Sequence, residues 1–281
     1  MPPRRLRLDA ELVRRGLARS RDQAAELIAE GRVTVSGATA TKPATAVTTD
    51  VALVVRADPG IPGGEEYVSR GGHKLAGALA AFEPRGLVVR GRRCLDAGAS
   101  TGGFTDVLLR HGATAVVAVD VGYGQLAWRL RTDDRVVVRD RVNVRELDLE
   151  QTGGPVDLVV GDLSFISLTL VLDALLGVVA DDGDLALMVK PQFEVGKERV
   201  GKGGVVRDPA LRAEAVRTVA DAAAARGWGA HGVTTSPLPG PSGNVEFFLW
   251  LRRGEPTVDH DEIDAVVSAG PASAVGEKVG E

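Results

Sequence analysis

The sequence predicts an α/β protein whose larger domain contains a mostly parallel sheet with helices on both faces. Apolar strand patterns and helical patterns alternate from about residue 92 to residue 226, and this alternation is typical of parallel sheets. A glycine-rich loop follows the first of these strands. The last two strand patterns follow one another without a helix between them, so we expect them to form an antiparallel pair.

The strands of this domain are predicted from short apolar runs. They cover residues 94–97, 115–120, 136–139, 156–161, 185–190, 230–235 and 245–251, and a long helix is predicted at 209–226. Ligands of open α/β sheets bind beyond the carboxyl ends of the strands. Four charged residues lie at or just beyond such ends, and we expect them around one crevice: Asp96, Asp120, Asp162 and Lys190.

A smaller α+β unit is predicted before this domain, in residues 1–56. Two short helices, the first ended by Gly16, are followed by short strands at 33–35 and 51–55. Because this unit has its own helices and strands, we expect it to form a separate domain.

The segments that flank the larger domain differ from it in composition. Residues 57–66 contain two prolines and three glycines, which excludes a continuous helix and predicts an extended linker. The larger domain then covers residues 67–254. From residue 255 the chain carries seven acids and one lysine, so we expect an acidic, flexible tail over 255–281.

The composition restricts the classes of function. The net charge is −4, so the whole molecule is not a general binder of polyanions, and any nucleic-acid contact requires a local patch. Cys94 is the single cysteine and the four histidines are scattered, so we expect neither an intrachain disulfide nor a metal site. No apolar run approaches the ~20 residues of a membrane span, and we expect a cytoplasmic protein without stable membrane association.

A local cationic patch is predicted in the first unit. Its arginines cluster around the helix pair and the following hairpin, where they suit RNA phosphates, although a merely solvated helix face would have a similar composition. The patch consists of Arg14, Arg15, Arg19, Arg21 and Arg32. The stretch from Arg7 to Gly37 resembles the alpha-L RNA-binding domain, first known from a ribosomal small-subunit protein. That resemblance implies recognition of folded RNA by its shape and backbone.

The loop after the strand at 94–97 is the predicted cofactor site. Its glycines can adopt positive φ and let the backbone approach a ligand, and the N–H groups of the following helix point toward that ligand. The spacing departs from the G-x-G-x-x-G of dinucleotide enzymes, and Asp120, at the end of the next strand, can bond both hydroxyls of a ribose. The alternative is a glycine turn that only packs the helix on the strand.

The run from Asp96 to Phe104 resembles the S-adenosylmethionine loop of class I methyltransferases. The resemblance implies a Rossmann-like fold with S-adenosylmethionine as its cofactor. We expect Asn143 or Asp140 to lie near the adenine. The expected cofactor-binding residues are Asp96, Gly98, Ser100, Thr101, Gly102, Gly103, Phe104, Asp120, Asp140 and Asn143.

Four charged residues in separate stretches form the predicted catalytic set. Lys74 lies near the start of a helix. Asp162 and Lys190 follow two strands, and an aromatic residue near Asp162 stands where a methyl acceptor would lie. Glu246 lies between apolar residues of a late strand, and a charge in such surroundings requires a partner such as lysine. The set resembles the Lys-Asp-Lys-Glu tetrad of FtsJ-type ribose 2′-O-methyltransferases.

The sequence around these four residues is closer still to the TlyA family, some of whose members are called hemolysins. The similar contexts are residues 69–75, 162–167, 189–194, 201–208 and 244–247, and the resemblance extends from Arg4 to about Arg252. It implies an alpha-L domain followed by an FtsJ-type domain, and methylation of cytidine 2′-hydroxyls in ribosomal RNA. The glycine- and proline-rich linker and the acidic tail depart from the family pattern.

The chemistry of this transfer constrains the role of Lys190. Methyl transfer to a ribose hydroxyl is an in-line displacement, so oxygen, methyl carbon and sulfur must be held collinear. A side chain must orient the hydroxyl or accept its proton as the bond forms. A neighbouring Lys74 favours the neutral form of Lys190, whereas nearby carboxylates favour its ammonium form. The sequence leaves open whether Lys190 acts as a base or as a cationic positioner.

Three other functions compete with this interpretation. A membrane-active cytolysin would fit the hemolysin name, but the chain lacks a strongly basic amphipathic helix with bulky apolar residues. A non-catalytic RNA-binding protein would need only the cationic patch, and an NAD-dependent dehydrogenase would also have a glycine-rich loop. Mass spectrometry of a bound ligand and a liposome leakage assay separate these alternatives.

Overall fold

The computed structural model describes residues 5–18, 21–29, 31–56, 67–240 and 242–270. The predicted linker, the end of the predicted tail and Arg19 of the cationic patch lie outside the described residues.

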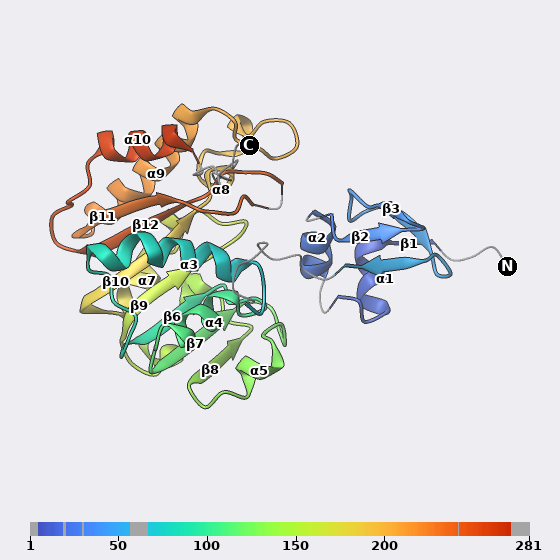
Figure 1. Ribbon diagram of the computed structural model, residues 1–281, viewed down its shortest axis with the longest axis horizontal. Helices are drawn as coiled ribbons and strands as arrows, with labels where there is room; N and C mark the ends of the chain where they lie inside the picture. The colour runs from blue at the N-terminus through green and yellow to red at the C-terminus, as the bar shows by residue number, and fades with distance from the viewer. Residues whose placement is uncertain (1–4, 19–20, 30, 57–66, 241, 271–281) are drawn as a thin grey trace, which may run out of the picture.

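The N-terminal unit is an α+β fold, as the sequence predicts (Figure 1). Its elements are β1 (Arg5–Arg7), α1 (Leu8–Arg14), α2 (Arg21–Ala29), β2 (Val33–Val35), β3 (Ala38–Thr39), β4 (Ala46–Thr48) and β5 (Leu53–Val55). Strands β1 and β4 form an antiparallel pair, and β2 lies between β3 and β5. Leu8 and Leu12 of α1 pack with Ile28 of α2 in a small core. Gly16 has φ +69° just after α1, which confirms the predicted stop.

The larger domain contains a seven-stranded sheet in the order β11-β12-β10-β9-β6-β7-β8. Its strands are β6 (Arg93–Ala97), β7 (Ala115–Asp120), β8 (Val136–Asp140), β9 (Val156–Gly161), β10 (Val179–Val189), β11 (Trp228–Thr235) and β12 (Phe247–Arg253). The pairs among β8, β7, β6, β9 and β10 are parallel, whereas β12 is antiparallel to both neighbours. The mostly parallel sheet with an antiparallel last strand is therefore confirmed. The last strand lies inside the sheet, between β10 and β11.

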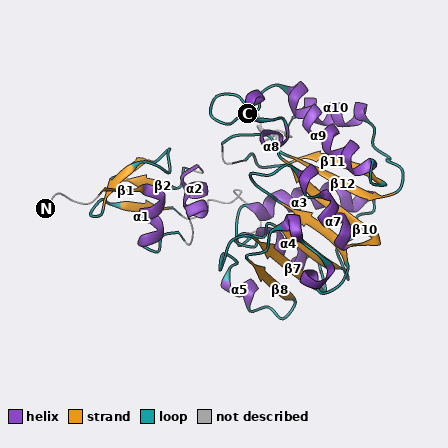
Figure 2. Cartoon of the chain, turned by 180° about the vertical axis from the view of Figure 1, so that it is seen from behind, coloured by secondary structure: helices purple, strands orange, loops and turns teal. Residues whose placement is uncertain are grey.

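Helices cover both faces of this sheet (Figures 1 and 2). The α-helices are α3 (Gly71–Phe82), α4 (Gly103–Arg110), α5 (Trp128–Arg131), α6 (Leu149–Thr152), α7 (Leu172–Val178), α8 (Pro191–Glu194), α9 (Pro209–Ala224) and α10 (His260–Ala269). Four short 3₁₀ helices are η1 (Glu83–Arg85), η2 (Val144–Glu146), η3 (Leu168–Leu170) and η4 (Lys197–Arg199).

The alternation of side chains along each strand divides the interior into two cores. Cys94 and Val116 point to the face covered by α3 and α4, where they pack with Leu75 of α3. Leu95 and Val117, the next residue of each strand, point to the face covered by α7, α9 and α10. Because both faces are buried, these strands read as continuous apolar runs rather than alternating ones.

Part of the predicted flexible tail is a helix, and the prediction is wrong over that stretch. In α10, Ile263 and Val267 lie one turn apart and are buried in the core beside α9 and β11. Asp259 caps this helix, since its side chain accepts a hydrogen bond from the N–H of Glu262. The acidic residues lie on the outer face of this amphipathic helix, while its apolar residues are buried. The acidic composition alone therefore suggested a solvated tail.

Candidate active site

The glycine-rich loop connects β6 to α4, and its glycines serve two purposes. Gly98 has φ +84°, and a Cβ there would lie 3.0 Å from the backbone oxygen of Asp162, so glycine allows the loops after β6 and β9 to approach each other. Gly102 has φ +97°, and a Cβ there would overlap the side chain of Leu130. Gly103 contacts Ser69, before α3. The last two glycines therefore pack helices, as in the alternative considered from the sequence.

A cavity of about 420 Å³ lies at the carboxyl ends of β6, β7 and β9. Its volume is within the range of small-molecule sites. The expected cofactor-binding residues that line it are Gly98, Ser100, Asp120 and Asn143. The others lie outside its described lining: Asp96, Thr101, Gly102, Gly103, Phe104 and Asp140. Asp162 and Ser164 form part of the wall, so the cavity reaches the predicted catalytic set.

The carboxylate of Asp120 is held in place at the cavity wall by backbone groups. The N–H of Ser100 donates to Oδ2 at 2.8 Å, and the N–H of Gly122 donates to Oδ1 at 2.7 Å. Each carboxylate oxygen retains a second lone pair, so Asp120 can still accept from the hydroxyls of a ribose.

Of the two residues expected near the adenine, only Asn143 lines the cavity. Its side-chain oxygen also caps η2 by accepting from the N–H of Arg145. Asp140 instead pairs with Arg131 at 2.9 Å and accepts from the N–H of Gly124. The structure therefore favours Asn143 as the cavity residue, and Asp140 as a support for the loop after β7.

Asp96 lies directly behind the glycine-rich loop and is fully buried. The backbone N–H and the hydroxyl of Thr105 donate to its Oδ2, but Oδ1 has no hydrogen-bond partner among the described residues. Burial raises the pKa of Asp96 to about 7, against the effect of these two hydrogen bonds. This orphaned acceptor lies outside the lining of the cavity, so it is not itself evidence of a ligand there.

The four predicted catalytic residues meet as two ion pairs beside the cavity. Lys74 of α3 pairs with Glu246, just before β12, at 2.6 Å, and both side chains are buried. Lys190, after β10, pairs with Asp162, after β9, at 2.5 Å. Burial acts to raise the pKa of Asp162, but the charges of Lys190 and Lys74 outweigh it and hold that pKa below its usual range.

Neighbouring polar groups complete these pairs, and the sequence interpretation did not assign them. The ammonium of Lys190 donates to Ser164 Oγ at 2.9 Å, and Gln192 Nε2 donates to Glu246 Oε1 at 3.2 Å.

Phe165 is 85% exposed with φ +64°, and its ring lies 5.3 Å from that of Phe193. These residues belong to the stretches that carried the family resemblance, but a role for each requires the tertiary structure.

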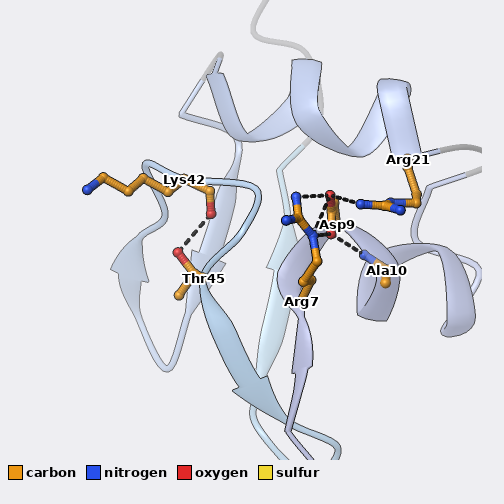
Figure 3. Close-up of polar contacts among 6 residues, drawn as sticks. All are labelled: Arg7, Asp9, Ala10, Arg21, Lys42 and Thr45. Atoms are coloured by element: carbon orange, nitrogen blue, oxygen red, sulfur yellow. Dashed lines mark hydrogen bonds and ion pairs between the residues drawn. The ribbon is translucent and has the colours of Figure 1, made fainter.

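In the N-terminal unit, most of the predicted arginine patch is paired with buried acids. Arg14 and Arg15 both bond Glu11. Arg21 shares Asp9 with Arg7 (Figure 3). The Arg7 and Arg14 hydrogen bonds lower the pKa of Asp9 and of Glu11, respectively, to about 2.

Two of the predicted patch residues also have structural contacts. Arg15 donates to the backbone oxygens of Val51 and Thr49, so it holds the turn between β4 and β5. Arg32 donates to the backbone oxygen of Arg56. Arg14 and Arg21 are more than half exposed and remain the better candidates for phosphate contacts.

The described residues show neither a helix long and apolar enough to cross a membrane nor a group of three or more His, Cys, Asp or Glu side chains that could hold a metal ion.

The strand order, the loop between β6 and α4, and the cavity at the carboxyl ends of the strands define a class I S-adenosylmethionine-dependent methyltransferase. Residues 67–253 match the FtsJ-like methyltransferase family, and residues 6–52 match the S4 domain. The chain belongs to the TlyA family, in which these two domains are joined.

Individual relatives agree with this assignment. The chain is 64% identical over 249 residues to the 16S/23S rRNA (cytidine-2′-O)-methyltransferase TlyA of Mycobacterium tuberculosis, covering 89% of this chain and 90% of that protein. It is 42% identical to the putative rRNA methyltransferase YqxC of Bacillus subtilis, covering 90% and 87%. A solved structure of a putative hemolysin from Streptococcus thermophilus has a TM-score of 0.70 at 37% identity, covering 96% of each chain.

Proposed function

We propose that this chain transfers a methyl group from S-adenosylmethionine to the 2′-hydroxyl of cytidine in ribosomal RNA. The observation that carries the proposal is that Lys74, Asp162, Lys190 and Glu246 form two ion pairs, with both lysines acting on Asp162, which lines the cavity. The activity named for the Mycobacterium tuberculosis relative supports the choice of cytidine and of ribosomal RNA. The cationic arginines of the N-terminal unit supply a surface of the right charge for such a substrate.

The cofactor would be held by residues of the loops after β6, β7 and β8. When bound, S-adenosylmethionine supplies an electrophilic methyl group on a sulfonium. Asp120 is placed to accept from ribose hydroxyls, and Asn143 would lie near the base of the adenosine. Gly98 brings the loops after β6 and β9 together and lines the same cavity. The residues present therefore fit this cofactor.

Lys190 is assigned to the reacting hydroxyl. Its ammonium lies between Asp162 and Ser164, both of which line the cavity. Because an ionised carboxylate at 2.5 Å favours the ammonium form, we assign Lys190 as a cationic positioner rather than a base. It orients the 2′-oxygen and stabilises the negative charge that develops there as the hydroxyl gives up its proton to solvent water; the bound cofactor would supply the methyl group that this oxygen takes.

The second ion pair supports the first. Lys74 and Glu246 are buried, and the charge of Lys74 also acts on Asp162. We assign to the Lys74–Glu246 pair the role of keeping Asp162 ionised and in place. Gln192 satisfies a second oxygen of Glu246, which a buried carboxylate requires.

The proposal is tested by mapping ribose methylation on ribosomal RNA. Purified chain, S-adenosylmethionine and unmodified ribosomal subunits are incubated, and the RNA is digested and analysed by mass spectrometry. We expect 2′-O-methylcytidine with the native chain and none with Lys190→Ala. Methylation of a base, or of no nucleotide in either subunit, would contradict the proposal.

A further inference from the structure

We propose that Glu194 is a positioning residue that ties the loop after β9 to the segment after β10 and so sets the place of the Lys190 ammonium. The inference rests on the proposed function, because it concerns the lysine assigned there to the reacting hydroxyl. Glu194 is the last residue of α8, four residues after Lys190.

The carboxylate of Glu194 is directed to the end of the loop after β9. Its Oε1 accepts from the backbone N–H of Leu168 at 2.9 Å, and its Oε2 accepts from the hydroxyl of Ser167 at 2.5 Å. Among the residues that the structure describes, no lysine or arginine forms an ion pair with Glu194. Its polar contacts there are with Ser167 and Leu168 of the loop after β9. Burial raises the pKa of the group, which is consistent with its enclosed position.

Two sets of side-chain contacts therefore join the loop after β9 to the segment after β10. Lys190 contacts Asp162 and Ser164 at the start of the loop. Glu194 accepts from Ser167 and from the N–H of Leu168 at its end. The backbone pairing of β9 with β10 ends at the pair of Gly161 with Leu187, before either segment begins. Beyond that point these side chains hold the segments together.

The loop between these two sets of contacts contains a conformation that requires such support. Phe165 has φ +64°, in the left-handed region that is unfavourable for a bulky residue. Strained backbone persists only where surrounding contacts hold it. The hydrogen bonds of Glu194 hold the residues directly after this turn. Their removal should therefore allow the loop that carries Asp162 and Ser164 to move.

The experiment compares variants of the full chain in single-turnover methylation of ribosomal RNA. With Glu194→Ala we expect the rate at saturating cofactor and RNA to fall by roughly 10²-fold, as a displacement of about 1 Å at a reacting group can cause. Cofactor affinity should change by a few-fold only. Glu194→Gln should restore most of the rate, because its oxygen still accepts from Leu168 and its amide can donate to Ser167.

A matched control separates this role from general loss of an acid. Glu262→Ala removes an acid of α10 that pairs with Arg85, and its printed side-chain partner lies in neither segment, so its rate should remain native. Ser167→Ala removes one of the two bonds to Glu194, together with the cap that this hydroxyl provides for η3, and should have an intermediate effect. This variant keeps the inference testable if Glu194→Ala fails to fold.

Hydrogen exchange provides a readout that does not depend on activity. The N–H of Leu168 should exchange faster in Glu194→Ala than in the native chain, and at the native rate in Glu262→Ala. A native methylation rate in Glu194→Ala, or a loss in Glu194→Gln equal to that in Glu194→Ala, would overturn the inference. If the native chain itself methylates no ribose, the proposed function fails instead, and the exchange data still test the tie.

Discussion

The two domains both pair buried acids with cations, but they expose the cations differently. In the N-terminal unit, Glu11 is fully buried while the side chain of its partner Arg14 is 52% exposed. In the methyltransferase domain, Glu246 is 1% exposed and its partner Lys74 only 6%. The first arrangement leaves the cation accessible at the surface, as binding to a large polyanion would require, whereas the second fixes the cation in one buried position.

This difference has an energetic reason. A half-exposed cation keeps part of its water, so it can be left without its acid at little cost. In a buried pair both charges have lost their water, so removing one of them leaves the other without compensation, which is costly. The lysines are thereby held in one geometry, which suits a reaction that needs atomic precision, while the arginines can adapt to RNA.

The largest expected effect is on the chemistry of the buried set. Lys190→Ala should lower the single-turnover rate of methylation by roughly 10²–10⁴-fold, because Lys190 acts on the hydroxyl in the transition state. Cofactor and RNA affinities should stay within a few-fold, as measured by calorimetry and filter binding. Lys197→Ala, at an exposed lysine of η4, is the control. A near-native rate in Lys190→Ala would mean that another group handles the hydroxyl.

The contrast in burial predicts unequal losses of stability. Glu246→Gln leaves Lys74 buried without its counter-charge and should lower the free energy of unfolding by about 3–5 kcal/mol. Glu11→Gln leaves two arginines that still reach water, so its cost should be smaller, roughly 1 kcal/mol. Urea unfolding of the full chain, followed by a probe in each domain, measures both. Equal losses would remove the distinction between the two kinds of pair.

The exposed arginines should dominate the salt dependence of RNA binding. Replacing both Arg14 and Arg21 with glutamine should lower the slope of log affinity against log salt concentration by about 2, since each phosphate contact contributes slightly under one unit. Arg226→Gln, at an arginine paired with Asp173, is the control. Filter binding over a range of potassium concentrations decides the outcome, and an unchanged slope would assign RNA binding to other residues.

Arg15 should behave differently from these two arginines. It donates to the backbone of the turn between β4 and β5, so Arg15→Gln should lower the melting temperature of the N-terminal unit more than Arg14→Gln does. Differential scanning calorimetry of both variants tests this difference. An Arg15 variant with native stability would show that the turn does not depend on the arginine.

The smallest expected effects are those of pH, and they have opposite signs for the buried acids of the N-terminal unit and for Asp96 of the methyltransferase domain. Asp9 and Glu11 have pKa values lowered to about 2, so the stability they contribute is complete above about pH 4.5 and is lost as the pH falls toward 2. The pKa of Asp96 is raised from 3.8 to about 7, so its contribution is complete below pH 3.8 and is lost as the pH rises through 7.

Melting temperatures measured between pH 3 and pH 8 without cofactor test these signs. Asp96→Asn should abolish the loss above pH 4 in the methyltransferase domain and leave the acid response of the N-terminal unit unchanged. If Asp96→Asn does not alter the pH profile, the buried carboxyl is not the group that titrates.

The sequence by itself determined the order and type of most elements. Strands 115–120 and 156–161 have the predicted bounds, because a strand buried on both faces is a continuous apolar run whatever surrounds it. Lys190 was predicted as the last residue of its strand and lies directly after it, because Pro191 cannot continue the ladder. The catalytic set was also identifiable, since each member lies within a short motif that carries the family resemblance.

Only the tertiary structure decided which of these residues touch. The pairing of Lys74 with Glu246 joins positions far apart in the chain, and no local pattern distinguishes it from a pairing with Asp162. The same reason explains why Gly102 and Gly103 pack helices instead of lining the cavity, and why α10 was missed. Local propensity depends on neighbours along the chain, whereas burial and ion pairing depend on neighbours in space, which are set only when the sheet and its helices pack together.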